Sequence, residues 1–136
     1  RKQILSTLSE EIDFTWQYYT LQKIRFDDRI ELTTAIDPAL RNWRIPAMSL
    51  QTLVENAVKH NSITGGNPLH IRIRTEGESF LIENNYTPRS DGDKESLGMG
   101  LERIRSVYRF YSEENISISV GDGPFRCRLP LLPPEK

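Results

Sequence analysis

Leu53-Val54-Glu55-Asn56-Ala57-Val58-Lys59-His60-Asn61 is the stretch on which the interpretation of the whole chain depends. Wound as an α-helix at roughly 100° per residue, it separates into an apolar arc and a polar arc. The apolar arc predicts packing against a core. The polar arc carries an acid, an amide, an ammonium group and an imidazole within two turns, as neighbours three and four residues apart: Glu55, Asn56, Lys59 and His60.

The polar arc has two interpretations. Amide and carboxylate oxygens suit magnesium and a lysine suits phosphate, so Asn56 beside Glu55 and Lys59 favours a joint site for a metal ion and an anion. The alternative is a solvated helix face on which Glu55 and Lys59 form an ion pair. The helix alone leaves both interpretations open.

Further segments, in a fixed order along the chain, favour the first interpretation. Besides the quoted helix they are Leu21–Arg29, Ile36–Pro38, Ile45–Pro46 and Leu97–Leu101. In this order they resemble the sensor histidine kinases, specifically the catalytic domain of the LytS-like subgroup. The quoted helix resembles the N box of that family, and Leu97–Leu101 resembles its second glycine box. The resemblance extends from about Thr7 to Leu129.

The resemblance implies the Bergerat ATP-binding fold, and the predicted elements agree with it. Their order is helix, strand, helix, hairpin, polar loop, helix, hairpin. That order indicates an α+β, two-layer sandwich, with a mixed and mostly antiparallel sheet covered by helices on one face.

Local patterns predict where these elements begin and end. A capping box at Thr7 and Glu10 begins a helix that ends near Phe26, with Trp16 in the core. Pro46 suits the first turn of the helix that ends near Asn61. Alternating apolar residues predict strands over Ile30–Ile36, Leu69–Arg74, Phe80–Ile82, Ile116–Val120 and Phe125–Leu129.

The chain before the last helix suggests how an anion would bind. Residues 84–97 lose every apolar pattern and are predicted to form a long polar loop, of a length typical of functional lids. The glycine turn Gly98-Met99-Gly100 then opens a helix over Leu101–Tyr111, where backbone amides favour negative charge. A simple tight turn is the alternative explanation of these glycines.

The resemblance implies a role for individual residues. Asn56 is the expected magnesium ligand, and Glu55 is the expected catalytic acid that helps to position the reacting group. The expected cofactors are ATP and Mg²⁺. The residues expected to contact the nucleotide are Asn56, Lys59, His60, Asn84, Gly98, Gly100 and Leu101.

The first glycine box departs from the family pattern. The family has Asp-x-Gly-x-Gly after the central strand, and its aspartate accepts a hydrogen bond from the adenine amino group. Asn84 aligns with that aspartate and is a weaker, neutral acceptor, while Tyr86 and Pro88 replace the glycines. Glu83 turned inward is a second candidate for the base contact. These departures leave a degenerate, pseudokinase-like module that signals by protein contact as the alternative function.

Composition restricts the class of protein. The chain has 136 residues and a net charge of −1, which suits one soluble domain and argues against general nucleic-acid binding. The single cysteine, Cys127, excludes an intrachain disulfide and indicates a reducing compartment, and its alternation with Phe125 and Leu129 predicts a buried thiol. No apolar run reaches the length of a membrane span.

The chain is expected to be a segment of a longer sensor kinase, because it begins at Arg1 rather than at methionine. We expect residues 1–6 to end a linker, 7–132 to form the ATP-binding domain, and 133–136 to be a tail. His60 and His70 do not resemble a phosphoacceptor, so the γ-phosphate is expected to pass to a histidine on a separate upstream helical domain, and then to a response regulator. The parent is expected to be a membrane-anchored homodimer with this domain in the cytoplasm.

Overall fold

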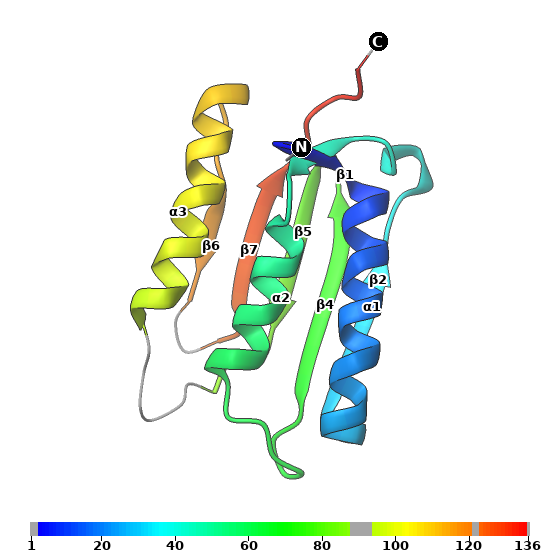
Figure 1. Cartoon of the computed structure of the whole chain (residues 1–136), viewed down its shortest axis with the longest axis vertical. Coiled ribbons are helices and arrows are strands. Elements are labelled where there is room, and N and C mark those ends of the chain that lie inside the picture. Colours follow the sequence, from blue (N-terminus) through cyan, green and yellow to red (C-terminus); the bar gives the residue numbers. More distant parts are fainter. Residues whose placement is uncertain (1–2, 88–93, 121–122, 136) are drawn as a thin grey trace.

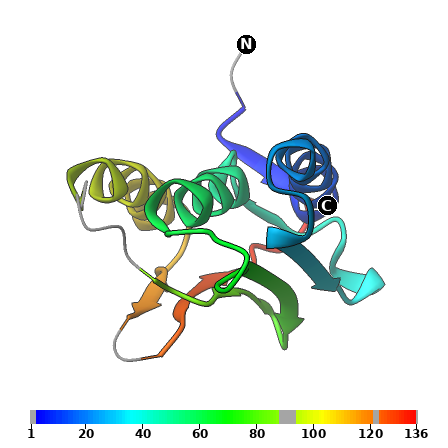
Figure 2. The ribbon, with the colours of Figure 1, turned by 90° about the horizontal axis from the view of Figure 1, so that it is seen from below.

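The computed structural model has the predicted two-layer arrangement. It describes residues 3–87, 94–120 and 123–135, with the backbone only at 94–99. A five-stranded sheet forms one layer, and helices α1, α2 and α3 cover one of its faces (Figures 1 and 2). The helices are α1 (Leu8–Phe26), α2 (Ser49–His60) and α3 (Lys94–Tyr111). The strands of the sheet are β2 (Ile30–Ala35), β4 (Leu69–Glu76), β5 (Ser79–Asn84), β6 (Ser117–Ser119) and β7 (Phe125–Pro130).

The strand order β2-β4-β5-β7-β6 makes the sheet mixed and mostly antiparallel, which confirms the predicted fold class. β2 is parallel to β4 because the chain crosses back through α2 between them, whereas the other neighbouring pairs are antiparallel. The β4–β5 hairpin turns at Gly77, whose positive φ of 60° glycine adopts without strain. No described helix is long and apolar enough to cross a membrane.

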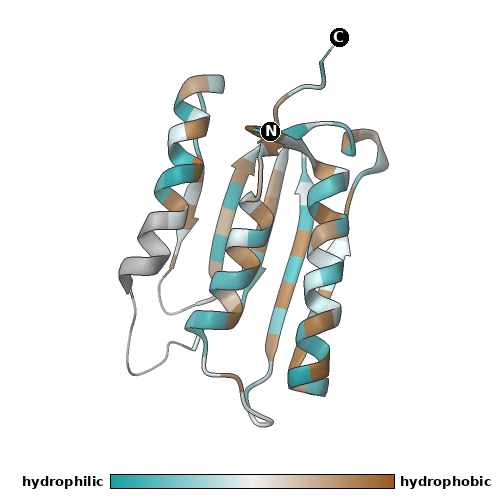
Figure 3. Ribbon diagram, in the orientation of Figure 1, coloured by the Kyte–Doolittle hydropathy of each residue, from teal (hydrophilic) through white to brown (hydrophobic). Residues whose placement is uncertain are grey.

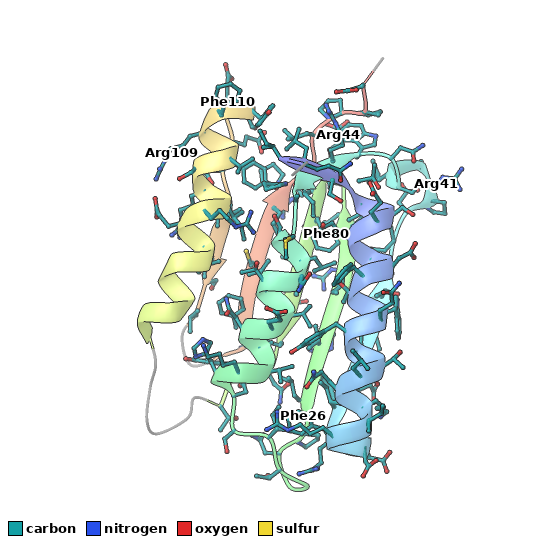
Figure 4. The ribbon with its side chains drawn as sticks, in the orientation of Figure 1. Phe26, Arg41, Arg44, Phe80, Arg109 and Phe110 are labelled. Carbon is teal, nitrogen blue, oxygen red and sulfur yellow. The ribbon has the colours of Figure 1, made fainter. Side chains whose placement is uncertain are left out.

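Alternation along the strands directs one set of apolar side chains toward the helices. Figure 3 shows this as apolar and polar residues in turn along β4 and β7. Phe80 on β5, labelled in Figure 4, has no exposed surface, and Ile82 pairs across the sheet with Ile73 and Cys127. The core between the layers is therefore built from the positions that the period-two pattern selects.

The start of α1 confirms the predicted capping box. The backbone N–H of Glu10 donates to Thr7 Oγ1 at 3.2 Å, and the Thr7 N–H donates to Glu10 Oε1 at 3.2 Å. The prediction for Trp16 is wrong, because its side chain is 37% exposed and packs edge-on against Tyr19 on the surface of the helix. The apolar residues of α1 exceed what one buried stripe can hold.

The predicted start of the central helix is wrong by three residues. Pro46 ends β3 (Arg44–Pro46), which pairs with β1 (Leu5–Thr7), and this pairing holds Pro46 extended. α2 begins at Ser49, after Met48 in a left-handed conformation. The carboxylate of Glu11 on α1 accepts from the N–H groups of Met48 at 3.0 Å and Leu50 at 3.1 Å. A residue distant in sequence thus caps α2.

The ends of the domain also differ from the predicted limits. Because β1 begins at Leu5, two residues assigned to the linker belong to the fold. At the other end Leu132 bridges to Arg44, and the Arg44 guanidinium donates to the Pro133 carbonyl at 2.9 Å and 3.2 Å. The residues after Leu132 therefore pack on the domain rather than leaving it as a free tail.

Candidate functional site

Helix α2 separates two cavities. A cavity of about 40 Å³ lies where α2 faces the end of β5 and the start of β7, and Asn56, His60 and Asn84 line it. A cavity of about 510 Å³ lies between α1 and α2, and Glu55 and Lys59 line it. The four polar residues that the sequence grouped on one arc thus divide into two pairs that border different cavities.

The small cavity holds an unsatisfied hydrogen-bond donor. Asn56 Nδ2 is buried and has no hydrogen-bond partner among the described residues. A buried polar group without a partner is costly, so a water or an acceptor on a ligand is expected there. Leu53, Ala57 and Phe125 make the rest of the wall largely apolar. Asn56 is therefore placed to contact a water or a ligand atom that enters the cavity.

The side chains of the small cavity fit a magnesium ion that binds together with a nucleotide. No three His, Cys, Asp or Glu side chains among the described residues gather into a metal cage. Magnesium in nucleotide sites keeps several waters and phosphate oxygens and takes only one or two protein ligands. The Asn56 amide, turned by half a rotation, presents an oxygen in place of its nitrogen and so supplies one such ligand.

Asn84 forms the floor of the small cavity. Its side chain, on a residue only 2% exposed, donates from Nδ2 to the Asn85 carbonyl at 2.9 Å. The Asn85 side chain in turn accepts from the His70 N–H at 2.7 Å and donates to the Pro68 carbonyl at 2.7 Å. The asparagine pair therefore connects the end of β5 to the start of β4.

Asn61 is a residue of this site that the sequence did not single out. Its Nδ2 donates to the Ala57 carbonyl at 2.8 Å, and its Oδ1 accepts from the Thr87 N–H at 2.6 Å. The Ser62 N–H also donates to the Thr87 carbonyl at 2.9 Å. An asparagine directly after a predicted helix is a signal for such a cap. Asn61 fixes the chain that leaves β5 to the end of α2.

The backbone after β5 does not require a glycine at position 86, where the family pattern has one and this chain has Tyr86. Among the described residues, positive φ values occur only at Asp27, Met48 and Gly77. The Tyr86 backbone is thus in a region open to any side chain, and its ring packs partly buried against the core and lines the small cavity. Pro88, the other replacement, lies outside the described residues.

The alternative base contact, Glu83, lies on the opposite face of the sheet. The side chain of Arg126 donates to its carboxylate at 2.7 Å and 2.8 Å, and Arg74 forms a second ion pair with it. Strand alternation directs Asn84 into the cavity and Glu83 away from it.

Glu55 faces α1. Gln51 Nε2 donates to its carboxylate at 2.9 Å, and Tyr18, Gln22 and Arg25 form the opposite wall of the larger cavity. Burial raises the pKa of Tyr18, the nearby Glu55 carboxylate raises it further, and Arg25 opposes this. Glu55 therefore does not share the small cavity with Asn56 and Asn84.

The predicted glycine turn and the end of the predicted polar loop are wrong for the backbone. α3 begins at Lys94, so residues 94–97, Gly98 and Gly100 are helical. At Gly100 an added Cβ would lie 2.7 Å from Thr52 Cγ2 on α2. Gly100 thus permits α2 and α3 to approach closely, one turn of α2 before Asn56. Leu101 is buried in the core. Asn84, the first residue of the predicted loop, is instead the last residue of β5, whereas 85–87 follow β5 and 88–93 lie outside the described residues.

The small cavity, at about 40 Å³, has room for water and is not fully enclosed. Tyr86 and Val120 also line it, and Val120 is about half exposed. Partly exposed side chains thus border the small cavity.

Comparison with known proteins shows which family the chain belongs to. No protein-family profile matches the chain. It is 33% identical over 120 residues to the sensor histidine kinase BtsS of Escherichia coli, which covers 83% of this chain and 21% of that protein. It is 31% identical over 136 residues to the sensor histidine kinase YesM of Bacillus subtilis, which covers 94% of this chain and 22% of that protein.

The chain belongs to the sensor histidine kinases. It spans about a fifth of the length of these curated relatives. Solved histidine kinases show the same fold. The catalytic domain of ThkA matches with a TM-score of 0.64 at 17% identity, over 95% of this chain and 97% of that one. Full-length ShkA in complex with AMPPNP matches with a TM-score of 0.58 at 14% identity, over 97% of this chain and 32% of that one.

Proposed function

We propose that this segment is the ATP-binding catalytic domain of a sensor histidine kinase. It would pass the γ-phosphate of magnesium-ATP to a histidine on a separate helical domain, for relay to a response regulator. The observation that carries the proposal is the meeting of Asn56 and Asn84 in one cavity: an amide without a partner on α2 and a buried amide at the end of β5. Family membership and the fold support the same assignment.

In this proposal each wall of the site has a separate task. Asn84 accepts from the base amine, and Asn56 supplies a magnesium ligand. His60 and Lys59 lie one turn beyond, toward the phosphates or the ribose. The first turns of α3, with Gly98, Gly100 and Leu101, lie along the triphosphate. Bound magnesium neutralises phosphate charge, and the domain otherwise acts by orienting the nucleotide and excluding water.

Glu55 and Lys59 have the weakest geometric support among the predicted site residues, because both border the α1 cavity. We keep Glu55 as a candidate for positioning the reacting group, and Lys59 as a candidate for contacting a phosphate, at the edge of α2. The cytoplasmic location and the membrane-anchored homodimeric parent are likewise proposals that rest on the resemblance.

A second candidate is the pseudokinase-like module. The observation in its favour is the replacement of both glycines of the first glycine box by Tyr86 and Pro88. If these replacements prevent a base from entering, the domain would keep the fold and signal by contact with a partner.

Titration calorimetry with AMPPNP, with and without magnesium, separates the two candidates. The ATP-binding domain should bind AMPPNP with magnesium, and Asn56→Ala should weaken binding by at least about tenfold, the size of one lost ligand interaction. Asn42→Ala is the matched control, since Asn42 lies in the connection before β3, away from this cavity. A folded protein that binds no AMPPNP at millimolar concentration would exclude the proposed function and favour the pseudokinase.

A further inference from the structure

The floor of the small cavity has a side chain of ambiguous polarity. An asparagine amide presents an oxygen that accepts and a nitrogen that donates, whereas an aspartate only accepts. A freely rotating amide at Asn84 would satisfy either an exocyclic amine or a ring carbonyl on a base. The replacement of a carboxylate by an amide would then, by itself, remove the ability to choose between bases.

The structure fixes this amide in one orientation. Asn84 is 2% exposed, and its Nδ2 donates to the Asn85 carbonyl at 2.9 Å. Turning the amide would bring its oxygen against that carbonyl oxygen, with two acceptors facing each other and no proton between them. The nitrogen is therefore committed to the backbone, and the oxygen is the atom left for a ligand.

The carbonyl that holds the amide is itself fixed by the Asn85 side chain. Asn85 Oδ1 accepts from the His70 N–H at 2.7 Å, and Asn85 Nδ2 donates to the Pro68 carbonyl at 2.7 Å. The β4–β5 pairing ends at Ile71 and Asn84, so this side chain continues the ladder by one step beyond its last residue pair. Both polar atoms of the Asn85 side chain are thus used to hold its own backbone in place.

We propose that Asn85 is a positioning residue for base selection: it holds the carbonyl that keeps the Asn84 oxygen directed at the base. The site then takes bases that carry an exocyclic amine and rejects those that present a carbonyl at the same place, although it lacks a carboxylate. This inference rests on the proposed nucleotide-binding function. Tyr86 and the residues after it have no part in it.

A series of nucleotides tests the orientation of Asn84 without any mutation. Magnesium complexes of ATP, purine riboside triphosphate and GTP are compared by titration calorimetry on the wild-type chain. Loss of the amine should weaken binding by about tenfold, the equivalent of one hydrogen bond, and GTP should bind more weakly still. Equal affinities would overturn the inference while leaving the proposed function intact. Binding of none of the three would instead refute the proposed function.

A variant tests Asn85 itself. Asn85→Ala should bring the ratio of ATP to GTP affinity toward one while magnesium dependence persists. Asn67→Ala is the matched control, because Asn67 also donates to a backbone carbonyl, that of Ser62 at 3.0 Å, in the loop between α2 and β4. It should leave the ratio unchanged. If Asn85→Ala weakens ATP and GTP by the same factor, Asn85 is only structural and the inference is wrong.

Asn85→Asp covers the case in which the alanine variant does not fold. The carboxylate still accepts from the His70 N–H, but it cannot donate to the Pro68 carbonyl, and its second oxygen repels that carbonyl oxygen. An intermediate ratio of ATP to GTP affinity is expected. A ratio equal to that of the wild-type chain would show that the side chain does not control the choice of base.

Discussion

At the scale of single residues, Glu83 is one of two buried carboxylates, with Glu11, in the described part of the chain. Its side chain is 9% exposed on the sheet face away from the helices, between Arg74 and Arg126. Burial by itself would raise the pKa of Glu83, but the hydrogen bonds and charges of Arg126 and Arg74 outweigh burial and lower it below the usual 4.5. The ion pairs thus stabilise the ionised form in the folded state.

Glu83 should make the free energy of unfolding depend on pH in the acidic range. Because its pKa is lower in the folded chain than in the unfolded chain, its contribution is complete above about pH 4.5 and is lost as the pH falls through the folded value. Denaturant unfolding from pH 7 to pH 3 should show a smaller loss of stability in Glu83→Gln than in wild type. At pH 7 the variant should be less stable by about 1–3 kcal/mol. Parallel pH curves for the two proteins would contradict this assignment.

At the scale of elements, the contact between α2 and α3 depends on one glycine. The Gly100 backbone faces Thr52, and Arg103 on α3 donates to the Ala47 carbonyl at 3.0 Å and to Thr52 Oγ1 at 3.4 Å. These contacts lie just before α2, at Ala47, and in its first turn, at Thr52, ahead of Asn56. The spacing of the two helices near the candidate site is therefore set by the absence of a side chain at Gly100.

The effect of Gly100→Ala on stability should change sign with the residue at position 52. Gly100→Ala gains about 1 kcal/mol of helix propensity, but overpacking against Thr52 Cγ2 costs about 1–3 kcal/mol, so the single variant should be destabilised. Thr52→Ser removes the opposing methyl group and keeps the hydroxyl that accepts from Arg103. In that background Gly100→Ala should be stabilising. Thermal and denaturant unfolding of the four proteins measures the cycle, and an equal effect in both backgrounds would refute the contact.

At the scale of the whole molecule, the core between the sheet and the helix layer is closed to solvent at Cys127. Cys127 on β7 is 0% exposed, between its partners Ile82 and Ile118. Burial raises the pKa of the Cys127 thiol to about 12, with a small opposing effect of Arg105. The thiol is therefore protonated and unreactive at neutral pH in the folded domain, as the sequence predicted for a structural cysteine.

Cys127 should report global unfolding. A thiol reagent such as dithionitrobenzoate should label it at the rate at which the whole domain opens, and not at the rate of a free thiol. Magnesium-AMPPNP at 100 times its Kd should slow the labelling by roughly 100-fold, because only the folded state binds it. At the same AMPPNP concentration, Asn56→Ala should reduce this protection to about tenfold or less, because its Kd is expected to be at least about ten times higher. Labelling at the rate of a free thiol would show that the core is not closed.

The fold could be predicted from local patterns, whereas the limits of several of its elements could not. The capping box at Thr7 and the alternating strands depend on neighbours within a few residues, and both were placed correctly. One error arose where a distant contact prevails, because Pro46 is extended by the pairing of β1 with β3. Residues 94–97 are helical where their polarity had indicated a loop.

The sequence by itself determined the family, the two-layer fold and the residue types of the site, because these follow from ordered motifs and from the periods of apolar residues. Only the tertiary structure decided how that site is divided. A helical period places Glu55 and Asn56 on one polar arc, but neighbours one residue apart differ by about 100°, and the packing of α1 against α2 assigns them to separate cavities. The orientation of the Asn84 amide was likewise decided in space, because the backbone that holds it is fixed from β4.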